Sequence, residues 1–265
     1  MAFALFYDWL DSSSFATITP TSTGASPEIG SDIVENAFDL SGCSLGPTWR
    51  GNEDLTVTLT TPTDEAEAFV VAGTSLDSND IIEIERDVGA GFVSLGFADY
   101  NASSRAFVFI PPLTGSPPVA YRITLSTSDA GVDEILTSFI GLARMRVDLD
   151  DANRPLKDWG SSDLSLSPGS LGGRLAQERR EQPDLDFPLR AMRWDDTQSQ
   201  EIRAMVREVR MVKPIAVVLD EENLDLDGNF IFGSLARMPA YRGHPGRFFD
   251  LVLSVLAITD GEVES

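Results

Sequence analysis

The chain has 265 residues, enough for one large domain or two domains of ordinary size, each with its own core. Its formal net charge of −22 repels phosphate backbones and anionic lipid, which argues against a general binder of nucleic acid or membrane surfaces. One cysteine, Cys43, excludes an intramolecular disulfide framework and a cysteine-rich zinc site, and one histidine, His244, excludes a multi-histidine metal site. We therefore expect neither a metal nor a cofactor.

The N-terminal segment is apolar from Met1 to Tyr7, but it lacks a basic region and is soon followed by Asp8 and Asp11. It is therefore not predicted to be a signal peptide. No run approaches the roughly 18–20 apolar residues that span a bilayer. We expect a protein that is made in a cytoplasm and does not insert into a membrane.

From Ala16 to about Val147, the sequence predicts many short strands separated by turn residues. Leu55–Thr60 alternates between apolar and polar residues, as a half-buried strand does. Gly89-Ala90-Gly91 predicts a hairpin turn. The other predicted strands are Phe15–Thr19, Phe69–Gly73, Ile81–Arg86, Phe92–Phe97, Ala106–Ile110, Ala120–Leu125 and Ile135–Met145. Short strands at this spacing indicate an antiparallel β-sandwich over residues 1–147.

Residues 148–184 are rich in Ser, Gly and Pro, which predicts an extended linker or arm and a domain boundary. Arg174, Arg179 and Arg180 lie close together there, within a strongly acidic chain. Either the arm is simply solvated, or these arginines dock on an acidic neighbouring subunit. The second hypothesis predicts that changing all three to Glu weakens assembly without unfolding the monomer.

Residues 185–265 predict a second β domain with one helix at about 196–210. An apolar stripe marks one face of this helix: Ile202, Met205, Val206 and Val209. The strands predicted around it are Asp184–Trp194, Ile215–Leu219, Phe230–Leu235 and Phe248–Ile258. The predicted fold is mostly β, with an N-terminal antiparallel sandwich (jelly roll) and a C-terminal β-sandwich or split barrel with one flanking helix.

No cluster of reactive side chains stands out. Asn223–Asn229 mimics the start of a calcium-binding loop, but Asn223 and Ser234 occupy the positions that need carboxylates, so a turn between two strands explains it better. His244 lies in a Gly/Pro-rich segment with no nucleophile beside it, so we expect a histidine in a loop and not a general base. Acidic pairs such as Asp195/Asp196 are expected by chance in a chain with 42 acidic residues. We therefore predict no catalytic residue and no enzymatic activity.

The N-terminal half resembles the opening of a discoidin-like (galactose-binding-like) jelly roll. The segments that carry the resemblance are Ala16–Thr19, Ile33–Asp39 and Thr48-Trp49-Arg50, with Tyr121–Ser126 and Ile140–Leu142 similar to the closing strands. Val34–Asp39 takes the place of a segment of the type alanine-glutamate-asparagine-leucine-aspartate. The resemblance covers about half of the chain and implies either a decorating role or contact with host sugars.

The C-terminal half resembles bacteriophage tail proteins of the distal-tail and tail-tube kind. The segments concerned are Ser170–Gly173, Leu185–Trp194, Asp195–Arg210, Pro214–Asp220 and Phe230–Leu235. The resemblance implies a structural component of a tail (distal tail, baseplate or tail-tube-associated), located in the virion after synthesis in the host cytoplasm. It also implies a ring of three or six subunits whose partners are copies of itself and other tail proteins. The acidic charge suits a tail tube that repels passing DNA.

Two alternatives stand beside this hypothesis. A carbohydrate-binding module protein would contact host-surface glycans through exposed aromatic residues, for which Trp9, Tyr100 and Tyr121 are the candidates, while Trp49 is expected in the sandwich core. An enzyme acting on polysaccharide would need a carboxylate pair held by a rigid core, and no such pair is evident. No direct binding of nucleic acid is expected.

Overall fold

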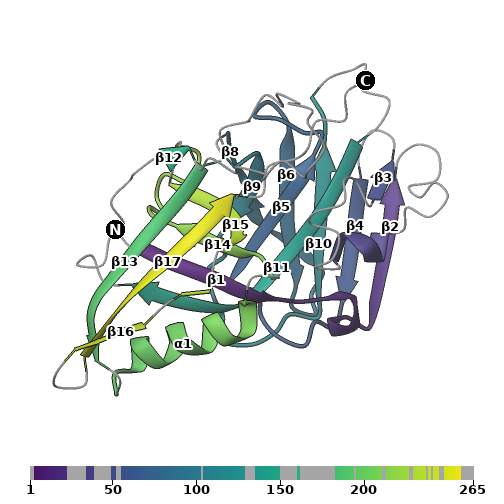
Figure 1. Ribbon diagram of the computed structural model, residues 1–265. Coiled ribbons are helices and arrows are strands. Elements are labelled where there is room, and N and C mark those ends of the chain that lie inside the picture. Colours follow the sequence, from purple (N-terminus) through teal and green to yellow (C-terminus); the bar gives the residue numbers. More distant parts are fainter. Residues whose placement is uncertain are drawn as a thin grey trace, which may run out of the picture.

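The computed structural model describes residues 3–22, 34–38, 49–51, 55–102, 104–128, 135–149, 160–161, 183–193, 195–210, 213–226, 229–236, 238–239, 241–244 and 248–257. Two antiparallel sheets dominate these residues (Figure 1). The strands of the smaller sheet are, in spatial order, β2 (Thr17–Ser22), β4 (Leu55–Thr60), β10 (Ala120–Ser126), β6 (Ile81–Asp87) and β7 (Phe92–Phe97).

The larger sheet contains strands from both halves of the chain. Its order is β12 (Gly160–Ser161), β13 (Pro183–Arg193), β17 (Phe248–Ala257), β15 (Phe230–Leu235), β14 (Ile215–Val218), β1 (Phe3–Trp9), β11 (Ile135–Leu149), β5 (Ala68–Thr74), β9 (Ala106–Phe109) and β8 (Asp99–Asn101). Off this path, β16 (Tyr241–His244) pairs with β17 and β3 (Trp49–Gly51) pairs with β11.

The smaller sheet packs on the β5–β9–β11 part of the larger one and forms the N-terminal sandwich. Alternation in β4 turns Leu55, Val57 and Leu59 inward, where they are fully buried. The same core includes Tyr121 and Ile140, one from each sheet. Two 3₁₀ helices, η1 (Ser12–Ser14) and η2 (Val34–Phe38), adjoin this sandwich.

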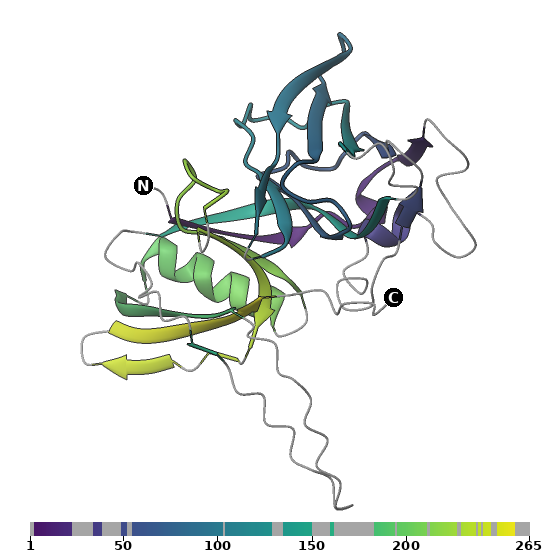
Figure 2. The same ribbon diagram turned by 90° about the horizontal axis from the view of Figure 1, so that it is seen from above.

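The C-terminal half is a half-barrel around one helix, α1 (Thr197–Val209). Figure 2 shows α1 between the β1–β11 part of the sheet and strand β17. Its apolar stripe is buried against residues from both sides: Ile202, Met205, Val206 and Val209 share a core with Leu5, Val147, Val217 and Leu253. Burial of one apolar face, rather than helix propensity, holds such a helix in place.

Strand β11 joins the two halves because its 15 residues serve both. Its first part pairs with β5 in the sandwich, for example Phe139 with Ala72. Its second part pairs with β1, where Val147 lies opposite Leu5. On its other edge β1 pairs with β14, so that Leu5 also lies opposite Val217. The N-terminal strand therefore completes the C-terminal half-barrel.

A third apolar core lies between the halves. It includes Trp9, Phe139 and Phe232, together with small residues of β5 and β9. The indole N–H of Trp9 donates to the carbonyl of Pro214 at 2.7 Å. Asn101 Nδ2 donates to the Leu224 carbonyl at 2.9 Å, which ties the sandwich to the loop between β14 and β15. Apolar and polar contacts thus fix the two halves against each other.

The structure confirms the predicted fold class: mostly β, with an N-terminal antiparallel sandwich and a C-terminal split barrel flanked by one helix. The helix expected at about 196–210 begins at Thr197 and ends at Val209. The division into residues 1–147, 148–184 and 185–265 stays a prediction. Strands from the first and the last of these segments belong to one continuous sheet, in which β1 and β11 lie between them. Among the helices described, none has the length and apolar character needed to span a membrane.

Candidate assembly surface

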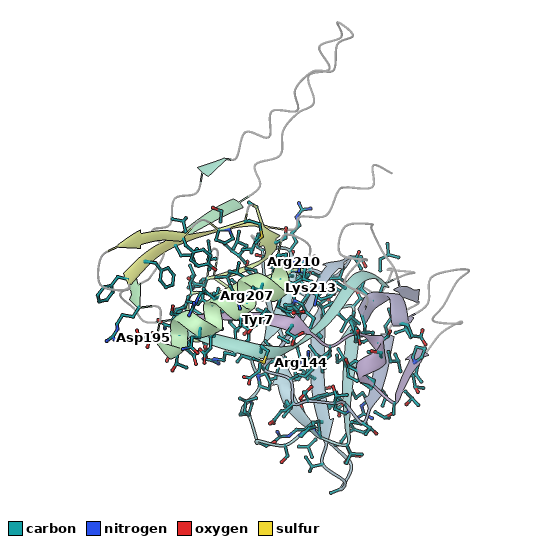
Figure 3. All side chains as sticks on the ribbon, turned by 60° about the horizontal axis from the view of Figure 1, so that its bottom comes forward. Tyr7, Arg144, Asp195, Arg207, Arg210 and Lys213 are labelled. Carbon is teal, nitrogen blue, oxygen red and sulfur yellow. The ribbon has the colours of Figure 1, made fainter. Side chains whose placement is uncertain are left out.

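The outward side of α1 and its C-cap has three arginines against two exposed glutamates, Glu201 and Glu208, although the chain as a whole is strongly acidic, and we call this side the basic face of α1. With Ile202, Met205 and Val209 turned into the core, Arg207 and Arg210 lie on the exposed side. Arg203 is half-buried one turn before Arg207, and its Nε donates to the Ser199 carbonyl at 3.1 Å. Figure 3 shows Arg207, Arg210 and Lys213 toward the C-terminal end of α1, with Arg144 nearby and Asp195 at the opposite end.

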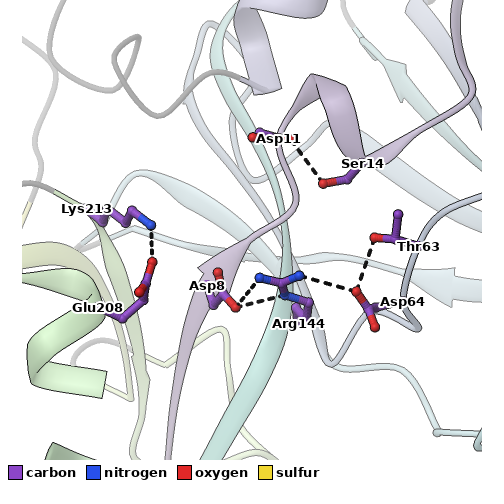
Figure 4. A network of polar contacts seen from close by, with 8 residues as sticks. All are labelled: Asp8, Asp11, Ser14, Thr63, Asp64, Arg144, Glu208 and Lys213. Atoms are coloured by element: carbon purple, nitrogen blue, oxygen red, sulfur yellow. Dashed lines mark hydrogen bonds and ion pairs between the residues drawn. The ribbon is translucent and has the colours of Figure 1, made fainter. Parts of the chain in front are cut away.

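A network of ion pairs borders this face along β1 and β11 (Figure 4). Arg144 donates from Nε to Asp8 at 2.8 Å and from Nη1 to Asp64 at 3.5 Å. Burial alone would lower the pKa of Arg144, but the hydrogen bonds and charges of these two carboxylates raise it above its ordinary value. At the C-terminal end of α1, Lys213 pairs with Glu208 and lowers the pKa of the Glu208 carboxyl. Most charges here are thus partnered within the molecule.

A second exposed surface lies on the outer side of β17. Phe249, Leu251 and Leu253 turn toward α1 and are buried, so the alternating residues Phe248 and Val252 turn outward. These two side chains are 37% and 38% exposed. Phe248 and Val252 therefore stand on the outer face of β17 on either side of Asp250, so this face offers two partly exposed apolar side chains and one acidic position.

Strand β16 extends the larger sheet by pairing with β17. Tyr241 lies opposite Leu251 and its ring meets that of Phe249 edge-to-face at 5.5 Å. Burial raises the pKa of Tyr241, while the nearby charges of Arg203 and Arg207 oppose the rise. The basic face of α1 and the exposed end of β16 are therefore neighbours.

The predicted arm residues Arg174, Arg179 and Arg180 lie outside the residues that the structure describes, so the docking-arm hypothesis stays a prediction. Sequence reasoning missed the basic face of α1, although a signal was present. From Ile202 to Lys213 the chain has four basic residues and one acidic residue, against a net charge of −22 for the whole. Three of these four basic residues, Arg203, Arg207 and Arg210, have the i, i+4, i+7 spacing that places side chains on one stripe of a helix.

Two of the three aromatic residues suggested for sugar contact were wrong choices. Trp9 and Tyr121 are buried, because Trp9 packs between the two halves and the Tyr121 hydroxyl accepts a hydrogen bond from the backbone N–H of Ala66 at 3.0 Å. Tyr100 is half-buried, and its ring contacts that of Phe107 at 5.0 Å. The side chain of Trp49, expected in the sandwich core, lies outside the described part.

The segment that mimicked a calcium loop is a connection between β14 and β15, as the turn hypothesis predicted. Asp220 accepts hydrogen bonds from the Glu222 backbone N–H and from Asn223 Nδ2, which organises the first turn of this connection. Within the described ranges no three His, Cys, Asp or Glu side chains gather in a way that could hold a metal ion. His244 was expected in a loop, but its backbone forms the last position of β16.

No family model matches the chain, and no curated protein matches it either. CpGH89CBM32-5 from Clostridium perfringens, solved in complex with GalNAc-β-1,3-galactose, is similar with a TM-score of 0.36 and 14% identity, over 51% of this chain and 99% of that one. Reduced XRCC1 bound to the DNA pol β catalytic domain is similar with a TM-score of 0.34 and 13% identity, over 51% of this chain and 95% of that one. The XRCC1 N-terminal domain in solution is similar with a TM-score of 0.30 and 18% identity, over 44% of this chain and 91% of that one. Likeness at this level carries no argument about function.

Proposed function

We propose that the protein is a structural component of a bacteriophage tail, at the distal tail, the baseplate or the tail tube, and that it acts by assembling with copies of itself and with other tail proteins. The observation that carries the proposal is the C-terminal half-barrel. Its strands β13, β14, β15 and β17 surround the helix α1, which follows β13 in the chain. This is the architecture that the resemblance to ring-forming tail proteins implies.

The outer side of β17 supplies the first surface for such contacts. Phe248 and Val252 are exposed on the strand whose inner residues anchor α1. Burying them against a neighbour would remove apolar area from water without disturbing the core beneath. A rigid scaffold with two partly exposed apolar side chains on an outer strand is a suitable unit for repeated, symmetric contacts.

Light scattering at several protein concentrations tests the proposal, first with the protein alone and then with other tail proteins. A discrete ring, or association only with a tail protein, supports assembly. The variant Phe248→Ser/Val252→Thr should weaken that association, whereas the matched variant Phe97→Ser/Val93→Thr, at equally apolar exposed positions of β7, should leave it unchanged. A monomer at every concentration and with every candidate tail protein contradicts the proposal.

Glycan binding remains the alternative proposal for the sandwich. Of the three aromatic candidates, Tyr100 is the one that is half-buried, whereas Trp9 and Tyr121 are buried. A glycan array with the intact protein and with Tyr100→Ala separates the two functions. Specific binding that is lost in the variant would favour sugar contact over a purely structural role.

A further inference from the structure

Arg207 and Arg210 differ from the cations around them because they lack an ion-pair partner within the described part of the chain. Arg144 is paired with Asp8 and Asp64, and Lys213 is paired with Glu208. Arg210 Nε instead donates to the Arg207 carbonyl at 3.4 Å, and its charge acts on the nearby Glu208 carboxylate without forming an ion pair with it. Both arginine side chains are exposed.

Their position favours contact with a large partner over a free ion. They lie at the C-terminal end of a helix whose opposite face is locked into the core, so their backbone is held rigidly. The negative end of the helix dipole already compensates part of their charge locally. What they add is a directed pair of guanidinium groups, which bind carboxylates in bidentate geometry.

Charge complementarity identifies the partner. Residues 1–147 contain 6 basic and 20 acidic residues, a net of −14, so another copy of this chain presents abundant carboxylates. Two copies with a net charge of −22 repel each other at long range, and a local basic surface is needed to orient their contact. The same overall charge opposes approach to nucleic acid.

We infer that Arg207 and Arg210 on α1 of one copy dock on the acidic surface of a second copy of this chain. This inference rests on the proposed assembly function and names one of its interfaces. The contact is heterologous, since a basic face meets a different, acidic face, and contacts of that kind close into rings or extend into filaments.

The test compares Arg207→Glu/Arg210→Glu with Arg207→Lys/Arg210→Lys in the full chain, by light scattering and sedimentation across a range of NaCl concentrations. Charge reversal should weaken self-association about tenfold or more, and the Lys variant should retain most of it. Salt should weaken the wild-type association more steeply than that of the charge-reversed variant.

Charge reversal also opposes the helix dipole, so circular dichroism melting is measured on each variant, and Arg207→Gln/Arg210→Gln replaces the Glu variant if the latter does not fold. Normal assembly of a folded charge-reversed variant overturns the inference and leaves the proposed function standing. A wild-type protein that does not associate with itself also overturns the inference, and one that in addition associates with no candidate tail protein contradicts the proposed function itself. Binding of duplex DNA that the charge reversal abolishes would also overturn the inference, because it would identify a different partner.

Discussion

The rings of Phe139 in β11 and Phe232 in β15 stack with 5.2 Å between their centroids and 20° between their planes. Trp9 meets both rings edge-on, at 5.6 Å and 5.7 Å. One residue of this trio comes from the strand that crosses both halves, one from the C-terminal hairpin and one from the N-terminal strand. The junction between the halves is therefore a packed aromatic core, and its integrity should decide whether they unfold together.

Phe232→Ala should lower the free energy of unfolding by about 3–5 kcal/mol, because it leaves a cavity in this core. Urea unfolding followed by far-UV circular dichroism and by tryptophan fluorescence should show coincident midpoints for the wild type. Phe97→Ala, at a side chain that is 59% exposed, is the control and should cost under about 0.5 kcal/mol. Separate transitions for the two probes would show that the halves unfold independently.

Gly141→Ala should destabilise the same region by about 1–3 kcal/mol through overpacking. An added Cβ at this position would lie 2.6 Å from Trp9 Cε3 and would also collide with the Phe139 ring, both of which are buried. Gly243→Ala is the matched control, since a Cβ there meets nothing within 4 Å. Thermal melts of the two variants should differ clearly, and equal melting temperatures would contradict the packing described.

Tyr121 should make stability depend on pH in the alkaline range. Burial raises the pKa of its hydroxyl to about 12, against the smaller opposing effect of the hydrogen bond from Ala66. Between the unfolded-state pKa of about 10 and the folded-state value, the folded protein holds the proton more firmly, so stability falls as pH rises through this window. The loss should reach about 3 kcal/mol above pH 12.

Comparing Tyr121→Phe with the wild type measures how much the Tyr121 hydroxyl contributes to the free energy of unfolding at each pH. The variant should be less stable than the wild type at pH 8 by about 1–2 kcal/mol, because the buried Ala66 N–H loses its acceptor. Urea unfolding at pH 8 and at pH 11.5 should show this difference shrinking as the wild type loses stability. A difference that stays constant with pH would mean that Tyr121 does not titrate as described.

Asp8 should tolerate glycine better than valine. Its φ of 59° is a left-handed conformation that a β-branched residue adopts only at a cost of about 1–3 kcal/mol. Asp8→Gly removes the partly exposed ion pair with Arg144, worth up to about 1 kcal/mol, but relieves backbone strain of similar size. Urea unfolding should therefore place Asp8→Gly near the wild type and Asp8→Val well below it. Equal destabilisation by both would show that the backbone conformation is not the cause.

The local elements were predictable because each carries its own periodicity. The alternation of Leu55–Thr60 matches β4, and the stripe of Ile202, Met205, Val206 and Val209 matches the buried face of α1. The predicted strand Ile135–Met145 was too short, since β11 continues to Leu149. Its last residues include Arg146 and Asp148, whose charged side chains interrupt an apolar pattern while they pair with each other at the surface.

The long-range pairings were not predictable in the same way. The apolar run Phe3–Tyr7 is not predicted as a strand from the sequence, but it belongs to β1, which is buried between β11 and β14. A short run of this kind fits any interior strand, and nothing in it specifies two partners that lie far along the chain. The same limit led to Trp9 as a sugar-contact candidate, because the residues that bury it come from β11 and β15.

The place of β1 has a consequence for how the chain folds during synthesis. Phe3–Trp9 leaves the ribosome well before its partner β14, which begins at Ile215. Until then one edge of β1 has no strand beside it, and Leu5 has no helix to cover it before α1, Thr197–Val209, has been made. Pairings between such distant segments form slowly, so the sandwich can fold while the chain is still growing, and the half-barrel closes only at the end. A nascent chain stalled before Ile215 would expose an unpaired apolar strand, which is a natural target for chaperones or for aggregation.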